Sequence, residues 1–231
     1  MFTVDQHLLE KSHDCLIGRR DIFWIIGAAS SGKSTISRTI TERSNVSLYD
    51  MDAHIYGNYA SLYNTERHPA NKTWLSAPNP LAWQLALSLE AFNAFNRAAS
   101  AEHFDLFTDD PEISDTQQPL LVDGGITHPS LLVKIIPREN IYCLDVNRAE
   151  RVKAWESSEA RAEMKKWIFD LPNPQVKWEK FLAFDEAIAQ TIRAECKAND
   201  IECLMRDEQT SVEELAKKVA EYFGIELASS A

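Results

Sequence analysis

Eight consecutive residues, Gly-Ala-Ala-Ser-Ser-Gly-Lys-Ser at positions 27–34, have the types and spacing of a loop that binds a polyphosphate. Glycines let the backbone curl so that successive N–H groups point at one anion, and a helix starting at Lys33 adds the positive end of its dipole. Lysine can bridge the β and γ phosphates, and a serine hydroxyl is suited to Mg²⁺. We therefore expect a nucleoside triphosphate to be bound by Gly27, Ala28, Ala29, Ser30, Ser31, Gly32, Lys33, Ser34 and Thr35.

The alternative is a strand-to-helix turn that carries these residues by coincidence. With glycine at roughly 7% of average usage, the full pattern arises by chance in about one chain of this length in a hundred. The loop also follows an apolar segment and precedes a helical one, which is the context that the motif requires. Nucleotide binding is therefore the favoured interpretation.

Two aspartates, Asp50 and Asp52, follow the next apolar segment, in the order Leu-Tyr-Asp-Met-Asp. Alternation along an extended chain places residues two apart on the same side, so both carboxylates are expected at the carboxyl ends of the strands, where ligands bind in such sheets. One is expected to hold Mg²⁺ through water and the other to accept a proton from a substrate hydroxyl, and both assignments are open. A solvated acidic turn is the alternative.

A third apolar segment ends in Asp123, followed by Gly124 and Gly125. An aspartate at such a strand end is the Walker B form, whose carboxylate orders the metal shell beside the phosphate loop. The metal ligands are thus expected to be Ser34, Asp50 and Asp123. The glycine pair allows close approach of the backbone to a substrate, although a plain Asp-Gly turn is also compatible.

Phosphoryl transfer also needs positive charge on the equatorial oxygens of the transferred group. Basic residues are concentrated after the fourth apolar segment, and Arg161 is the candidate catalytic cation among them, although solvated basic helix faces are common. His54 and His128 follow the aspartates and the glycine pair, but a lone histidine is a weak signal.

The elements that must position these residues alternate along the chain. Short, continuously apolar segments at 22–26, 46–49, 120–122, 141–144 and 201–205 predict strands buried on both faces. Helices are predicted at 33–43, 80–99, 129–136, 148–169, 177–198 and 212–223, several with N-cap residues. This alternation predicts an α/β fold with a parallel sheet flanked by helices.

The chain of 231 residues is expected to form one domain. Residues 55–119 interrupt the alternation and are predicted to be a helical, substrate-binding insertion, with a polar stretch at 108–118. Residues 148–175 are predicted to form a lid, which ends where Pro172 and Pro174 break the helix.

Composition narrows the partners. A net charge of −11 argues against nucleic acid and anionic membranes as partners. The four cysteines lack metal-ligand spacing and are expected to be reduced structural thiols, and no apolar signal segment opens the chain. These features predict a cytoplasmic protein without a membrane partner, and they do not specify an oligomeric state.

The segments GAASSGKSTISRTI, LYDMDAHI, LLVDGG and IYCLDV together resemble the shikimate kinase and gluconate kinase group of P-loop kinases. The resemblance covers most of the chain outside residues 56–118, and it matches Asp50, Asp52, Gly124, Gly125 and the phosphate loop. It implies a five-stranded parallel sheet in the order 2-3-1-4-5, ATP with Mg²⁺, and phosphorylation of an alcohol or a similar acceptor. Asp123 and Ile126 depart from the glycine triplet of shikimate kinases, and no arginine segment for the shikimate carboxylate is recognisable.

The sequence therefore predicts an ATP-dependent kinase of a small polar metabolite, with Lys33, Asp50, Asp52 and Arg161 as catalytic residues and Asp52, Gly124 and Gly125 in contact with the acceptor. The alternative hypothesis is a nucleotide-gated regulatory ATPase with no small-molecule acceptor. A closed polar pocket beside the γ-phosphate would favour the kinase.

Overall fold

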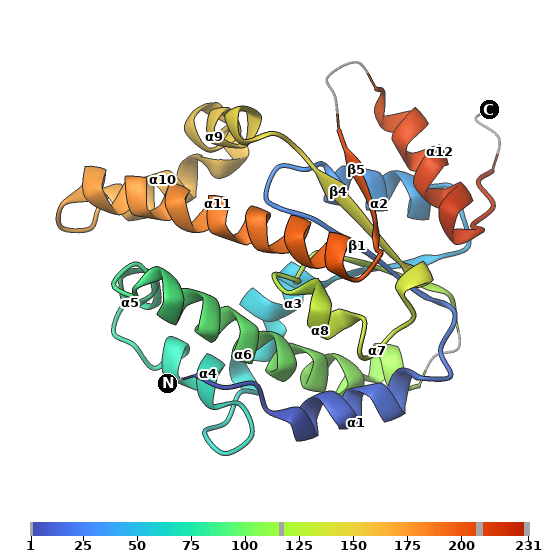
Figure 1. Cartoon of the computed structure of the whole chain (residues 1–231), viewed down its shortest axis with the longest axis horizontal. Helices are drawn as coiled ribbons and strands as arrows, with labels where there is room; N and C mark the ends of the chain where they lie inside the picture. Colours follow the sequence, from blue (N-terminus) through green and yellow to red (C-terminus); the bar gives the residue numbers. More distant parts are fainter. Residues whose placement is uncertain (1, 116–117, 207–209, 229–231) are drawn as a thin grey trace.

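A computed structural model describes residues 2–115, 118–206 and 210–228. In this part of the chain, five strands form one parallel sheet in the order β2-β3-β1-β4-β5 (Figure 1). Their bounds are β1 Ile22–Ile26, β2 Ser47–Asp50, β3 Leu120–Asp123, β4 Ile141–Asp145 and β5 Glu202–Met205. Each predicted strand is confirmed to within a residue or so at its ends, and the α/β P-loop fold with this strand order is confirmed with them.

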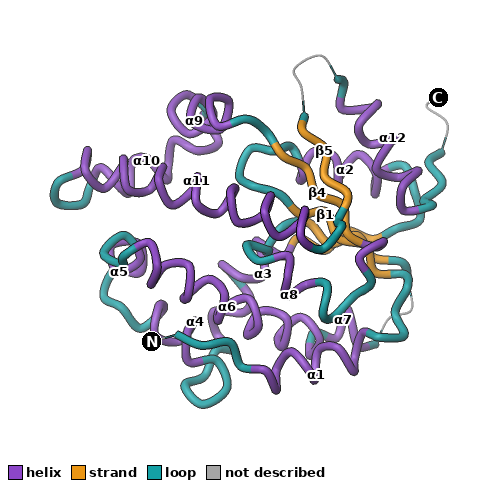
Figure 2. The backbone as a smooth tube through the Cα atoms, viewed as in Figure 1, coloured by secondary structure: helices purple, strands orange, loops and turns teal. Residues whose placement is uncertain are grey.

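Helices cover the sheet on both faces, so that the strands form a central layer (Figure 2). One face carries α2 Lys33–Glu42 and α12 Val212–Phe223, which pack side by side. Their apolar residues join inward-facing strand residues such as Ile25 and Leu144 in one buried cluster. A capping box between Ser211 and Glu214 fixes the start of α12, which the sequence predicts to the residue.

The opposite face carries a larger core that includes parts of α1 Gln6–Leu16, α3 Met51–Tyr56, α6 Leu89–Asp109, α8 Pro129–Leu132 and α11 Pro174–Ala198 (Figure 1). Trp24 of β1 is fully buried there and lies against Phe104 and Phe107 of α6. The long helix of the segment between β2 and β3 is therefore part of the main core.

The segment between β2 and β3 contains α3, α4 Pro69–Leu75, α5 Pro80–Gln84, α6 and α7 Pro111–Ser114, with a 3-10 turn at Asn58–Ser61. A buried polar network ties it to α1. Asp105 on α6 accepts from Lys11 at 2.8 Å and from His68 at 2.9 Å, and it pairs with Arg67 as well. Because the Asp105 side chain is fully buried, these partners are what allows it to stay charged.

Between β4 and β5 lie α9 Arg148–Ser157, the 3-10 turn Glu159–Arg161, α10 Ala162–Phe169 and the long helix α11. Arg151 anchors this region because its buried guanidinium donates to the Val146 carbonyl at 2.8 Å and pairs with Asp185 and Glu186 of α11. The helices α9 and α11 are thereby fixed to the end of β4.

Several predicted helices differ from the observed ones. The predicted helix 80–99 is wrong as one element, because the chain turns after Gln84 and Ser88 caps a new helix by accepting from the Ala91 N–H at 3.1 Å. The predicted helix 148–169 breaks at Ser158, whose backbone is extended. Helix 129–136 stops at Leu132, α2 ends one residue short of the prediction, and α11 starts at Pro174 instead of 177. The polar stretch at 108–118 includes the helix end at Asp109 and all of α7.

Helix α1 was not predicted. Asp5 caps it by accepting from the His7 N–H at 2.9 Å, and Leu8, Leu9, Ser12 and Leu16 form its buried side. Those positions have helical spacing, so the signal was present in the sequence. Among the described residues, every helix is too short or too polar to span a bilayer.

Candidate functional site

The predicted phosphate loop connects β1 to α2 at the carboxyl end of the sheet. Gly27 has φ 151°, and a Cβ there would lie 2.0 Å from the Leu144 carbonyl oxygen, so only glycine fits beside β4. Gly32 has φ 93° and is the N-cap residue of α2. Ser30 adopts φ 64°, an uncommon conformation for a residue with a side chain. The backbone has the tight curl that a loop of inward-pointing N–H groups requires.

The side chains of this loop divide into packed and unpartnered groups. Ala28 is buried, and Ala29 packs against the aromatic cluster between α5, α6 and α9 to α11. The hydroxyls of Ser30 and Ser31 are buried without a hydrogen-bond partner in the described part of the chain. Buried hydroxyls of this kind are costly unless a ligand or water satisfies them, so they fit a bound anion.

The helix that follows carries the remaining motif residues. Lys33 and Ser34 lie in its first turn and are partly exposed, whereas Thr35 is exposed. No ion pair of the described residues includes Lys33, so its ammonium is available for a phosphate. The structure therefore places residues 27–35 in the phosphate loop and the first turn of α2, as expected.

Asp50 and Asp123 are direct neighbours in the register of β2 and β3, at the ends of both strands. Asp50 also caps α3, since its Oδ1 accepts from the Ala53 N–H at 2.9 Å. The sequence argument for Asp52 was wrong in its reason. Asp52 lies in the first turn of α3, outside the strand, and the turn of this helix brings it toward the glycine pair.

Asp52 contacts the loop after β3. Its Oδ1 accepts from the Gly125 N–H at 3.1 Å, and a Cβ at Gly124 would lie 2.6 Å from its Oδ2. The same Cβ would lie 3.1 Å from Cε of Lys33, so the two side chains approach Gly124 on the same face. The structure thus joins the second aspartate, the motif lysine and the glycine pair in one small region.

Gly124 and Gly125 adopt a backbone conformation that requires glycine. Gly124 and Gly125 have φ 76° and 72°, and a Cβ at Gly125 would lie 2.2 Å from Cγ of Met51. The indole N–H of Trp24 donates to the Gly124 carbonyl at 2.9 Å and so fixes the loop that follows β3 to β1. Trp24 was predicted only as a strand residue, and no spacing rule identifies this contact.

Asp123 is almost completely buried beside the phosphate loop. Burial raises the pKa of its carboxyl, and the Ser34 hydroxyl and the Lys33 ammonium oppose that rise. Its Oδ1 has no hydrogen-bond partner in the described part of the chain. An unpartnered carboxylate oxygen beside a hydroxyl is a donor set that suits the hydrated shell of Mg²⁺.

No group of three or more His, Cys, Asp or Glu side chains among the described residues has a metal-holding arrangement. Mg²⁺ in nucleotide sites is held by one or two carboxylates, waters and the phosphates themselves, so such a group is not required. The residues at Ser34, Asp50 and Asp123 fit that type of site.

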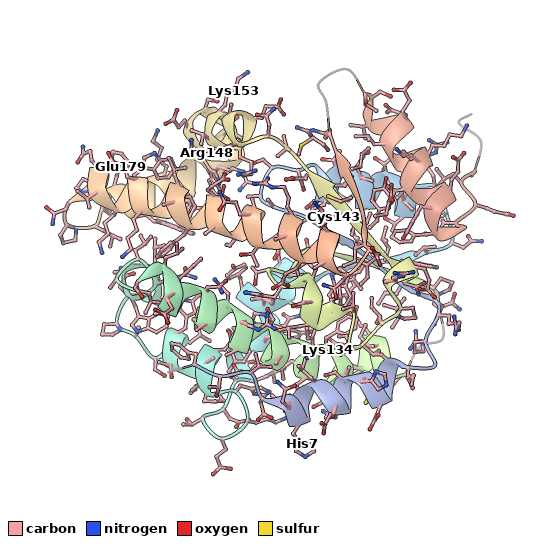
Figure 3. The ribbon with its side chains drawn as sticks, viewed as in Figure 1. His7, Lys134, Cys143, Arg148, Lys153 and Glu179 are labelled. Atoms are coloured by element: carbon pink, nitrogen blue, oxygen red, sulfur yellow. The ribbon has the colours of Figure 1, made fainter. Side chains whose placement is uncertain are left out.

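Arg161 lies at the end of the 3-10 turn before α10, with its guanidinium 4.1 Å from the ring centroid of Trp155. Burial lowers the pKa of this guanidinium, and the charges of Asp185 and Asp52 oppose the change. The role of Arg161 as the catalytic cation stays a prediction. Of the other cations in the region, Arg151 is in a buried ion-pair network, and Lys153 projects into solvent from α9 (Figure 3).

Tyr56 was missed by the sequence analysis. It is the last residue of α3, one helical turn after Asp52, and its ring is 72% exposed. The spacing of four residues places Tyr56 and Asp52 on the same side of α3.

The two histidines near the motifs have structural partners. His54 stacks on Tyr49 and lies 3.1 Å from its hydroxyl, and His128 lies 3.0 Å from the Asn93 side chain.

Surface hollows of about 440 and 570 Å³ occur elsewhere, the first beside α9 and the second near Arg20 and Gly224. The closed polar pocket expected at the phosphate loop stays a prediction.

No family model matches this sequence, and a search of the curated proteins finds no match. Among solved structures, the chain is similar to one described as NadR protein in complex with NR, with a TM-score of 0.41 and 13% identity. The similarity covers 93% of this chain and 55% of the other, so this chain spans about half of that protein's length. Similarity at this level assigns no activity to the chain.

Proposed function

We propose that the chain is an ATP-dependent kinase that transfers the γ-phosphoryl group to a hydroxyl of a small polar metabolite. The observation that carries the proposal is the placement of Asp52 against Gly124 and Gly125, with Lys33 close to the same face of Gly124. A nucleotide-binding loop alone would suit many activities. A carboxylate held beside the motif lysine supports the transfer of phosphate to an acceptor.

In this proposal the backbone N–H groups of residues 27–35 and the ammonium of Lys33 bind the phosphates of ATP. Ser34, Asp50 and Asp123 hold Mg²⁺, which supplies positive charge to the phosphate oxygens when it is bound. Asp50 is assigned to the metal because it lies next to Asp123 in the register of β2 and β3, at the ends of both strands.

Asp52 accepts the proton of the acceptor hydroxyl as the hydroxyl oxygen bonds to the γ-phosphorus. The bond between that phosphorus and the β,γ-bridging oxygen breaks, and ADP leaves with the electron pair. The hydrogen bond from the Gly125 N–H fixes the Asp52 carboxylate, and Arg161 offsets charge on the transferred group. The helical segment 55–119 and the lid 148–175 are proposed to enclose the acceptor and exclude water.

The experiment is ADP formation over a panel of small hydroxyl-bearing metabolites, with the wild type and two variants. Lys33→Ala removes a charged phosphate ligand, and Asp52→Asn keeps the shape of the side chain but removes the base. Both are expected to reduce acceptor-dependent ADP formation by about 100-fold or more, since a positioned base contributes about 10²–10⁴-fold.

Lys218→Ala and Asp14→Asn are matched controls, because both side chains are exposed on helices of the same protein. They are expected to retain full activity. Undiminished activity in Lys33→Ala or Asp52→Asn would remove the role assigned to that residue. ADP formation that no acceptor stimulates would favour the regulatory ATPase instead.

A further inference from the structure

Arg206 immediately follows β5 and lies over the start of α2. Its backbone N–H donates to the Asp145 carbonyl at 2.8 Å, which continues the pairing of β4 and β5. Its terminal nitrogen Nη1 lies 3.0 Å from the position that a Cβ would have at Gly32, and its Cδ and Cζ lie 3.9 Å from the same point. The side chain therefore extends from the edge strand across β4 to the phosphate loop.

This placement brings two cations to one helix end. The N-terminus of a helix carries a partial positive charge, so a guanidinium there is repelled unless an anion is also bound. Lys33 is the first residue of the same helix, and no ion pair of the described residues includes Lys33 or Arg206. An anion bound at the start of α2 would offset the repulsion between these two cations and the helix end.

We propose that Arg206 is a nucleotide-binding residue outside the glycine-lysine motif and that its guanidinium binds the phosphate chain. The proposal rests on the proposed function, because it concerns the same nucleotide. It adds a contact from the other half of the sheet, which the motif does not include.

The strand order indicates which phosphates Arg206 contacts. Asp50 and Asp123 end β2 and β3, on one side of β1, whereas Arg206 follows β5, on the other side of β1. The transferred γ-phosphoryl group belongs on the carboxylate side, where Asp52 is. Arg206 is thus assigned to the phosphates that stay with the nucleoside, and it should contribute to ADP binding as well as to ATP binding.

The test is titration calorimetry of ADP and of inorganic tripolyphosphate with the folded wild type and its variants. A charge-assisted hydrogen bond to phosphate corresponds to about 10-fold to 100-fold in affinity, so Arg206→Ala is expected to weaken both ligands by that factor. Arg206→Lys should restore part of the loss, because it keeps the charge but loses the planar pair of donors.

Arg38→Ala is the matched control, since Arg38 is exposed on the same helix α2, more than one turn from the loop. It is expected to bind both ligands as the wild type does. Arg206→Gln keeps most of the side-chain volume and replaces the alanine variant if that variant does not fold.

Three results would overturn the inference. Equal ADP affinity in the wild type and in Arg206→Ala or Arg206→Gln removes the contact. A loss for ADP with no loss for tripolyphosphate moves the guanidinium to the nucleoside and refutes the phosphate assignment. Absence of any nucleotide binding by the wild type refutes the proposed function itself, and is distinguished by the wild-type titration alone.

Discussion

Gly124, which lies beside both Asp52 and Lys33, provides a test in which one methyl group is added to the site. In Gly124→Ala the new Cβ would lie 2.6 Å from Oδ2 of Asp52 and 3.1 Å from Cε of Lys33. Ordinary contacts between such atoms are about 3.5 Å or longer, so the carboxylate must retreat by about 1 Å. Misplacement of a catalytic group by about 1 Å costs about 100-fold in rate, which is the expected loss of kcat/KM for phosphate transfer.

Gly224→Ala separates this effect from the backbone cost. Gly224 has φ 69°, close to the 76° of Gly124, but a Cβ there would meet nothing within 4 Å. Both variants should lose about 1–2 kcal/mol of stability from the left-handed conformation, measured by urea unfolding. Transfer activity should fall in Gly124→Ala alone. Equal activity in the two variants, with Asp52 intact in both, would refute the proposed arrangement of Asp52 and Lys33.

Three further predictions concern stability and reactivity. Arg151→Ala should lower the free energy of unfolding by about 3–5 kcal/mol, because it leaves Asp185 buried without its partner. The side chain of Arg148 is 68% exposed, so Arg148→Ala should change the free energy of unfolding little. Equal losses for the two variants in urea unfolding would contradict the buried ion-pair network of Arg151. Burial lowers the pKa of His128 to about 4, so on acidification the unfolded chain binds this proton before the folded protein does. The free energy of unfolding should therefore fall by up to about 3 kcal/mol from this residue as the pH drops from about 6.5 toward 4. In His128→Gln that decline, followed by urea unfolding at each pH, should be shallower, and an unchanged slope would exclude His128 as its source. A thiol reagent should label the exposed Cys15 and Cys203 in the native protein, and the buried Cys143 and Cys196 only after unfolding. A single labelling rate for all four would contradict this burial pattern.

The sequence identified the parts of the fold that local chemistry dictates. The apolar strands and the loop at residues 27–34 depend on short patterns, and the observed sheet follows them closely. Boundaries inside the helical regions were less predictable, because Ser88 and Ser158 break helices through local backbone conformation that the apolar periodicity does not reveal.

The arrangement of the candidate site depends on contacts between distant segments. Asp52 was expected near the strand ends for the wrong reason, and its contact with Gly125 depends on how α3 turns after β2. Arg206 reaches Gly32 from the far edge of the sheet, and no spacing rule connects residues so far apart in the chain. Cys143 and Cys203, both free thiols, are likewise neighbours only because of the register of β4 and β5.

The most direct test of the central claim is phosphorus NMR of the products formed from ATP and an acceptor that stimulates ADP formation. If Asp52 and the phosphate loop act together as a kinase site, a new phosphate-ester signal should grow in step with ADP in the wild type. The same signal should be lost in Asp52→Asn. Growth of inorganic phosphate alone, with no ester at any stage, would contradict the account, because the phosphoryl group would then have gone to water.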